Sequence, residues 1–159
     1  MVKVGDKVPS ATLRTIGPEG PKAITTEELF APGKKVVAFA LPGAFTPTCS
    51  AKHVPGYVQH LDELKQKGVD EVWCLAVNDG FVMAAWGREL GAFGKIRMLG
   101  DGSAELAKKL GLDTEIAGMG TRSRRFSLLI DQGIVQRVNV EEPGKFLVSN
   151  AETMLEQLG

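Results

Sequence analysis

The sequence is organised around one stretch, Lys35-Val36-Val37-Ala38-Phe39-Ala40-Leu41-Pro42-Gly43-Ala44-Phe45-Thr46-Pro47-Thr48-Cys49-Ser50. Its first half is apolar and rich in β-branched and aromatic residues, which predicts a buried strand over 35–41. Pro42-Gly43 and Pro47 interrupt the strand, and helical periodicity follows them. Cys49 is therefore expected where a loop becomes a helix. Unpaired backbone N–H groups and the helix dipole favour a thiolate at such a position.

The composition is that of an ordinary globular protein, with 43% hydrophobic and 24% charged residues in a chain of 159. This size predicts a single domain over 1–159. The 19 basic and 19 acidic residues cancel, which argues against a nucleic-acid partner. No apolar run approaches the ~20 residues of a membrane-spanning helix, so no membrane partner is expected. The first residues lack signal-peptide features, which predicts the cytoplasm, or a plastid or mitochondrion if a presequence has been removed.

The chain has only two cysteines, Cys49 and Cys74, and two histidines. This is far from the cysteine density of a small secreted scaffold, so a reducing compartment is expected. The scattered positions of these residues give no metal-ligand spacing. We therefore expect neither a metal nor another cofactor.

Strands and helices are expected to alternate along most of the chain. The strand at 35–41 is followed by strands at 72–77 and 96–99, and the intervening helices are expected after Cys49, over 81–90 and over 103–110. A hairpin of 125–130 and 134–140 and a last helix complete the order. This pattern predicts an α/β protein with a central mixed β-sheet flanked by helices, compatible with a thioredoxin-like fold, in which chemistry sits at the carboxyl ends of the strands.

Several local features are predicted from shorter patterns. Residues 1–16 are expected to form an N-terminal edge hairpin ended by a turn at 17–21, and 111–120 to form a loop. Capping boxes are expected at Thr25/Glu28 and at Ser149/Glu152. The helix after Cys49 is expected to kink at Pro55 and to end at Gly68. In the strand at 134–140, a shared face is expected for Ile134, Val138 and Val140.

The string around the cysteine, P-G-A-F-T-P-T-C-S followed by K-H-V-P-G, resembles the peroxidatic-cysteine signature of type II (PrxII, or Prx5-like) peroxiredoxins. The blocks V-N-D, F-V-M with Trp86, and G-T-R-S-R-R-F are similar to plant-type members, and the resemblance spans almost the whole chain. It implies a thioredoxin-like thiol peroxidase that acts on hydrogen peroxide and alkyl hydroperoxides in antioxidant defence. It also implies a homodimer packed through loops near the active site.

The resemblance assigns roles to individual residues. Cys49 would attack the peroxide and become a sulfenic acid, and Arg125 matches the family's active-site arginine. Thr46 would accept from the peroxide or donate to the sulfur, and Pro42 would shield the thiolate from water. These four residues are the expected catalytic and substrate-binding set, with the Cys49 backbone N–H as a further donor.

Other interpretations of the same residues remain open. Thr46 could be a simple N-cap, and His53 could be a base paired with Cys49, although packing or an interface is the favoured role. Arg124 is expected to face away from Arg125 if both lie on a strand, and the role of Arg122 is undecided.

Cys74 is the candidate resolving cysteine, because it is the only other thiol. In the middle of a strand, however, a cysteine usually acts as a small hydrophobic residue, and a disulfide needs Cα atoms within about 7 Å. The favoured cycle therefore uses an external thiol, either glutathione with glutaredoxin or thioredoxin.

Two rival functions come from other classes. A thiol-disulfide oxidoreductase on the same fold is disfavoured because Thr46 stands where a C-x-x-C motif would have its first cysteine. A non-catalytic redox-sensing or partner-binding module is the second rival, and a fast reaction with peroxide would distinguish it from the enzyme.

Overall fold

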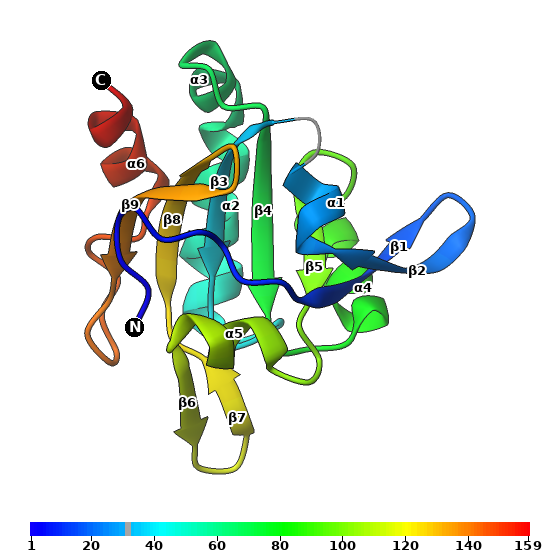
Figure 1. The fold of residues 1–159 in the computed structure, drawn as a ribbon. Helices are drawn as coiled ribbons and strands as arrows, with labels where there is room; N and C mark the ends of the chain where they lie inside the picture. Colours follow the sequence, from blue (N-terminus) through cyan, green and yellow to red (C-terminus); the bar gives the residue numbers. More distant parts are fainter. Residues whose placement is uncertain (31–32) are drawn as a thin grey trace.

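A computed structural model describes residues 1–30 and 33–159, and in it a central sheet lies between two groups of helices (Figure 1). The sheet has seven strands in the order β2-β1-β5-β4-β3-β8-β9. Strand β3 runs parallel to β4 and β4 parallel to β5, whereas β8 pairs antiparallel with β3. The strands are β1 (Thr12–Gly17), β2 (Gly20–Thr25), β3 (Lys35–Ala40), β4 (Glu71–Ala76), β5 (Arg97–Gly100), β8 (Phe126–Asp131) and β9 (Ile134–Val140).

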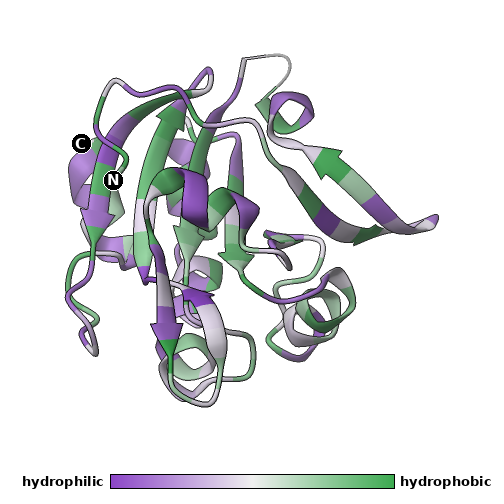
Figure 2. Ribbon diagram, turned by 60° about the horizontal axis from the view of Figure 1, so that its bottom comes forward, coloured by the Kyte–Doolittle hydropathy of each residue, from purple (hydrophilic) through white to green (hydrophobic). Residues whose placement is uncertain are grey.

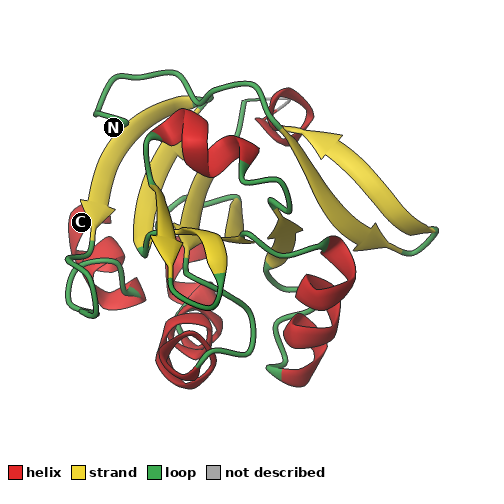
Figure 3. Cartoon of the chain, turned by 90° about the horizontal axis from the view of Figure 1, so that it is seen from below, coloured by secondary structure: helices red, strands yellow, loops and turns green. Residues whose placement is uncertain are grey.

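Helices cover both faces of this sheet (Figure 3). They are α1 (Thr26–Phe30), the π-helical turn η1 (Cys49–His53), α2 (Val54–Gln59), α3 (Leu61–Gln66), α4 (Gly80–Glu89), α5 (Glu105–Leu110) and α6 (Ala151–Leu158). A separate hairpin, β6 (Asp113–Ile116) and β7 (Gly120–Ser123), lies beyond the carboxyl ends of β3 and β4, at the bottom of Figure 1. The predicted mixed sheet between helices is therefore present.

The core consists of two apolar layers, one on each face of the sheet. Side chains alternate along β3, so Val37 and Phe39 pack toward α2, α3, α4 and α6, whereas Val36, Ala38 and Ala40 pack toward α1 and α5. The central strands are correspondingly the most hydrophobic part of the ribbon in Figure 2. Because both faces of β3 are buried, the segment that follows it emerges from the centre of the core.

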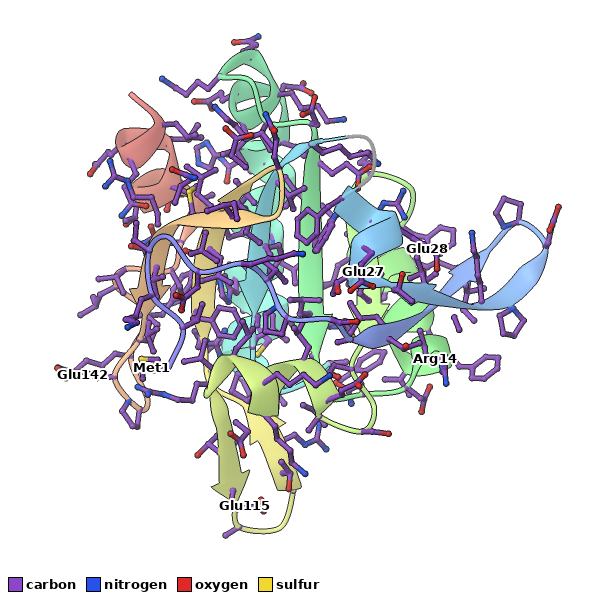
Figure 4. All side chains as sticks on the ribbon, viewed as in Figure 1. Met1, Arg14, Glu27, Glu28, Glu115 and Glu142 are labelled. Carbon is purple, nitrogen blue, oxygen red and sulfur yellow. The ribbon has the colours of Figure 1, made fainter. Side chains whose placement is uncertain are left out.

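The N-terminal hairpin is present, but its strands differ from the prediction. It consists of β1 and β2 joined at Gly17–Gly20, so the second strand follows the turn that was expected to end the hairpin. The capping box of α1 is confirmed, because the Glu28 N–H donates to Oγ1 of Thr25 and the Thr25 N–H donates back to Oε1 of Glu28. Figure 4 labels Glu27 and Glu28 on this short helix.

The helix after Cys49 is divided into three segments. The Val54 N–H donates to the carbonyl of Cys49, a π-helical bond, directly before Pro55 at the start of α2. Pro55 has no N–H for a regular helical bond, and the change from π-helical to α-helical bonding falls at the position of the predicted kink. A second break at His60, which separates α2 from α3, was not predicted.

Two local predictions are wrong, and a third is wrong for one residue. The segment 111–120 is largely part of the β6–β7 hairpin rather than a loop. Asn150, not Ser149, caps α6, since its side chain accepts from the Thr153 N–H.

In β9, Val138 and Val140 pack against the same apolar cluster, as predicted, but Val135 rather than Ile134 joins them there. A β-bulge leaves Gln136 as an extra residue, which shifts the alternation before it and leaves Ile134 exposed.

Candidate active site

Cys49 lies where the sequence predicts it, at the start of a helical turn that follows β3. The thiol is fully buried, and the carboxyl ends of β3 and β4 face the same region. Phe45, in the loop before it, adopts a left-handed conformation with φ of 64° that non-glycine residues rarely use. The loop therefore makes a tight reversal that returns the chain to the sheet end at Cys49.

Arg125 approaches Cys49 from a distant part of the sequence, between β7 and β8. Its Nη2 donates to Sγ of Cys49 at 3.1 Å, and its Nη1 lies 2.9 Å from Nδ1 of His53. A guanidinium has no acceptor, so Nδ1 of His53 must be the acceptor in this pair. The strand pair β3–β8, in which Ala40 faces Phe126, fixes this approach.

His53 is fully buried and holds one tautomer. Its Nε2 lies 3.1 Å from the carbonyl of Ser149, which can only accept, so Nε2 carries the proton and the ring is neutral. Burial first, and then the charge of Arg125, lower the pKa of His53 from 6.5 to about 3. A base with so low a pKa binds protons weakly at neutral pH. The geometry therefore favours the structural role of His53 over a Cys–His base pair.

Glu141, which the sequence analysis did not single out, holds Ser149, the residue whose carbonyl accepts from His53. Glu141, buried after β9, accepts from the backbone N–H groups of Leu147, Val148 and Ser149 and from the Ser149 hydroxyl. Burial by itself would raise the pKa of Glu141, but these donors outweigh it and the pKa lies below its usual value. No short motif marks this residue, because its partners follow it in a turn of irregular backbone.

The loop between β3 and Cys49 contains the other two predicted residues. The Thr46 hydroxyl donates to the carbonyl of Gly43 at 2.7 Å, and the Thr46 carbonyl accepts from the Ser50 N–H. Its side chain thus closes the loop rather than capping the helix. Pro42 and Arg125 line one wall of a cavity of about 450 Å³ that extends along β6 to the segment 141–145. Glu115 and Glu142, labelled in Figure 4, are also among its lining residues.

The neighbours of Arg125 in the sequence point elsewhere. Arg124 donates from Nη2 to the Glu141 carbonyl. Because Arg124 and Arg125 lie between β7 and β8 rather than on a strand, the expected strand alternation does not apply to them. Arg122 donates to three backbone carbonyls at the ends of β3, β4 and its own hairpin.

Cys74 lies in the centre of β4, paired with Phe39 of β3 and Met98 of β5, and is fully buried. Both cysteines are free thiols that belong to the same apolar cluster. Burial first, and then the nearby charge of Cys49, raise the pKa of the Cys74 thiol well above its usual value. A thiol of this kind is a poor nucleophile at neutral pH.

In residues 1–30 and 33–159, His, Cys, Asp and Glu side chains nowhere gather in a group of three that could hold a metal ion. None of the helices described is both long and apolar enough to cross a membrane.

A buried thiol that accepts from an arginine at the end of a thioredoxin-like sheet defines the class of thiol-based redox proteins. Similarity to known proteins identifies the family within this class. The Redoxin family profile matches residues 3–155. The chain is 47% identical to Peroxiredoxin-2E, chloroplastic, of Arabidopsis thaliana, across 99% of this chain and 69% of that protein. Peroxiredoxin-2B of the same plant is 45% identical, across 99% of this chain and 98% of that protein.

Solved structures agree with the sequence relatives. Reduced Prx3 from Vibrio vulnificus, in a crystal structure with hydrogen peroxide, matches with a TM-score of 0.97 and 51% identity over 100% of both chains. The chain belongs to the Redoxin family and, within it, is a type II peroxiredoxin of the plant type, a thiol peroxidase with an antioxidant function. The fold and the family resemblance predicted from the sequence are confirmed.

Proposed function

We propose that Cys49 is the residue that reduces the peroxide, with Arg125, Thr46 and Pro42 as its partners. The observation that carries this proposal is the 3.1 Å contact between Nη2 of Arg125 and Sγ of Cys49. A guanidinium at hydrogen-bond distance from sulfur stabilises the thiolate, which is the nucleophilic form. Cys49 also begins a π-helical turn, and the first N–H groups of a helix favour an anion.

The reaction forms one bond and breaks one. The thiolate sulfur of Cys49 attacks one oxygen of ROOH, the O–O bond breaks, and the departing RO⁻ takes a proton to leave as ROH. Cys49 becomes a sulfenic acid. The second guanidinium edge of Arg125 and the Cys49 N–H are proposed to stabilise the developing charge, as donors in an oxyanion hole do.

Thr46 is proposed to orient the substrate as an acceptor. A hydroxyl has one hydrogen, and that of Thr46 is donated to the Gly43 carbonyl. Its lone pairs are therefore available to the O–H of the peroxide, whereas donation to the sulfur would require this bond to break. Pro42 supplies an apolar wall without an N–H that could compete for the peroxide oxygens.

The proposed recycling reaction uses external thiols. One thiol attacks the sulfenic acid to give a mixed disulfide and water, and a second thiol releases Cys49 as a thiol and a new disulfide. We propose glutathione with glutaredoxin, or thioredoxin, as the reductant, because Cys74 is confined between two neighbouring strands. Cys49 is also buried, so a protein reductant needs its helical turn to open first.

The remaining proposals concern the protein as a whole. We propose a single domain over 1–159 that acts on hydrogen peroxide and alkyl hydroperoxides. A homodimer is proposed through loops near the site, supported by the exposed rings of Phe45 and Phe81, at 54% and 66% of their full exposure. We propose the cytoplasm as the compartment, with a plastid or mitochondrion as the alternative.

Replacing Cys49 tests the assignment. Cys49→Ser is expected to abolish peroxide consumption with every thiol reductant, because a serine hydroxyl is not ionised at neutral pH. Consumption of hydrogen peroxide is followed against time, with Cys74→Ser as the matched control. Full activity of Cys49→Ser would contradict the proposal, and disulfide reduction without peroxide would favour the oxidoreductase alternative.

A further inference from the structure

Arg122 of β7 joins three backbone segments at the carboxyl end of the sheet. Its Nε donates to the carbonyl of Met119 at 3.1 Å, and its Nη1 lies 3.2 Å from the carbonyl of Val77 and 3.5 Å from that of Pro42. Met119 belongs to the β6–β7 hairpin, Val77 follows β4, and Pro42 belongs to the loop after β3. One half-buried guanidinium therefore ties the hairpin to the ends of two central strands.

Gly43 is the residue against which this guanidinium packs. A Cβ built on Gly43 would lie 2.9 Å from Nη1 of Arg122, closer than real Cβ atoms approach other atoms. The other nearest atoms, in Thr46 and Met119, lie at ordinary contact distances of 3.5 and 3.6 Å. Gly43 is not among the residues with positive φ, so its backbone does not require glycine. A side chain at this position would instead enter the space occupied by the end of Arg122.

The segment held by Arg122 is the one that orients Thr46. The Gly43 carbonyl accepts the only hydrogen of the Thr46 hydroxyl, and Ala44 is tied to the same strand end through its N–H bond to Oδ1 of Asn78. A shift of Gly43 would rotate the Thr46 hydroxyl and displace Pro42. Arg122 thus reaches the proposed peroxide pocket through the backbone, without touching Cys49.

We propose that Arg122 is a positioning residue for peroxide reduction, which fixes the Pro42–Gly43 wall and, through the Gly43 carbonyl, the acceptor direction of Thr46. This inference rests on the proposed roles of Cys49, Thr46 and Pro42. In this inference Arg122 assists cleavage of the O–O bond by holding the backbone in place, not by its charge. The orientation of groups around reacting atoms commonly changes rates by about 100-fold for displacements of about 1 Å.

The test separates the reaction with peroxide from the general reactivity of the thiol. Arg122→Ala is expected to slow the reaction of Cys49 with hydrogen peroxide about 10- to 100-fold. Alkylation of Cys49 by iodoacetamide, which uses neither Thr46 nor the Pro42 wall, is expected to stay within about twofold. Both rates are measured in single-turnover experiments, with thermal unfolding recorded in parallel. Arg137→Ala, at an exposed position on β9, is the matched control and should leave both rates unchanged.

Gly43→Ala displaces the tip of Arg122 by another route. Its new methyl group meets the end of a flexible side chain, so the fold should persist while the Arg122 contacts are lost. We expect Gly43→Ala to slow the peroxide reaction in the native background and to add little when Arg122 is already alanine. Such non-additivity is the signature of two residues that act through one contact.

Several results would overturn the proposal. One is an unchanged rate with peroxide in Arg122→Ala, and another is an equal decrease in the rates with peroxide and with iodoacetamide. A third is a double variant, Arg122→Ala with Gly43→Ala, whose rate decreases by the product of the two single effects. Full recovery in Arg122→Lys would also overturn it, because an ammonium supplies the charge but not the planar fork. If Arg122→Ala fails to fold, a native rate in Gly43→Ala is decisive against the proposal. Activity in Cys49→Ser would instead indicate that the proposed site itself is wrong.

Discussion

Arg125 contacts His53 and Cys49 with the two ends of the same guanidinium, 2.9 Å from Nδ1 of the histidine and 3.1 Å from the sulfur. The neutral ring of His53 accepts a hydrogen bond from Arg125 but leaves the positive charge of the guanidinium intact. A carboxylate in that position would neutralise this charge. The positive charge therefore remains directed at the thiol. His53 is held in turn by the Ser149 carbonyl, which also accepts from the Tyr57 hydroxyl.

Arg125→Ala should slow the reaction with peroxide about 10²–10³-fold, the usual effect of removing one preorganised donor from a developing oxyanion. Stopped-flow peroxide kinetics measure this effect. An unaltered rate would show that this arginine has only a structural role.

His53 makes the folded protein sensitive to acid. Its pKa is about 3 in the folded state and 6.5 in the unfolded chain, so the unfolded state binds the proton first as the pH falls. The stability associated with the neutral ring is present above pH 6.5 and is lost as the pH falls from 6.5 toward 3. Over this window the free energy of unfolding should decrease more in the native protein than in His53→Gln, which cannot titrate.

Urea unfolding at several pH values measures this difference. Glu141 also loses stabilising interactions in acid, because its pKa is lowered. Its contribution is present in both proteins, so the comparison isolates the part of the pH dependence that requires His53. Parallel curves for the native protein and His53→Gln between pH 6.5 and 3 would contradict the shifted pKa of this histidine.

Cys74→Ser should retain most turnover with glutaredoxin and glutathione, because Cys74 is a buried thiol with a raised pKa. A serine hydroxyl placed in this apolar strand costs about 1–3 kcal/mol of stability unless it finds a partner. Cys74→Ala is therefore the control that keeps the site apolar. The mass of the native protein after one equivalent of peroxide, with and without glutathione, distinguishes sulfenate, internal disulfide and glutathione adduct. Loss of turnover with every reductant in both variants would identify Cys74 as the resolving cysteine.

Much of the fold was predictable because its central strands are buried on both faces. Short continuous apolar runs with β-branched and aromatic residues, such as those of β3 and β4, predict buried strands, and their alternation with helices implies parallel pairing. The hairpin β6–β7 was missed for the opposite reason. Its residues are exposed or only half buried apart from Ser123, so no apolar period marks the strands.

The candidate site was predictable only in part. Cys49 and the arginine that meets it could be predicted from the motif blocks, but the contacts of Glu141 and Arg122 are made to backbone groups. Backbone carbonyls and N–H groups are the same for every residue type, so a sequence cannot indicate which of them a buried side chain will reach. The face of Ile134 in β9 was predicted wrongly because one extra residue at Gln136 shifts the alternation between Ile134 and Val138.

His60 should contribute to stability in the opposite pH direction from His53. Its Nδ1 lies 2.9 Å from Glu63 and its Nε2 lies 3.0 Å from Glu152 of α6, so both ring nitrogens face carboxylates. Only the doubly protonated ring can donate to both. The hydrogen bond to Glu63 is the largest of the effects that raise the pKa of His60 above 6.5.

A raised pKa in the folded state means that the folded protein holds the proton more tightly than the unfolded chain does. The contribution of His60 is therefore fully present below pH 6.5 and is lost as the pH rises through the folded-state pKa. His60→Gln should destabilise the protein most at low pH, and the difference should shrink in alkaline buffer and in high salt, because the pair is near the surface. Urea unfolding of both proteins from pH 5 to 9 provides the measurement. If the loss of unfolding free energy in His60→Gln were the same at every pH, the contact of His60 with α6 would stabilise the protein by packing rather than by charge.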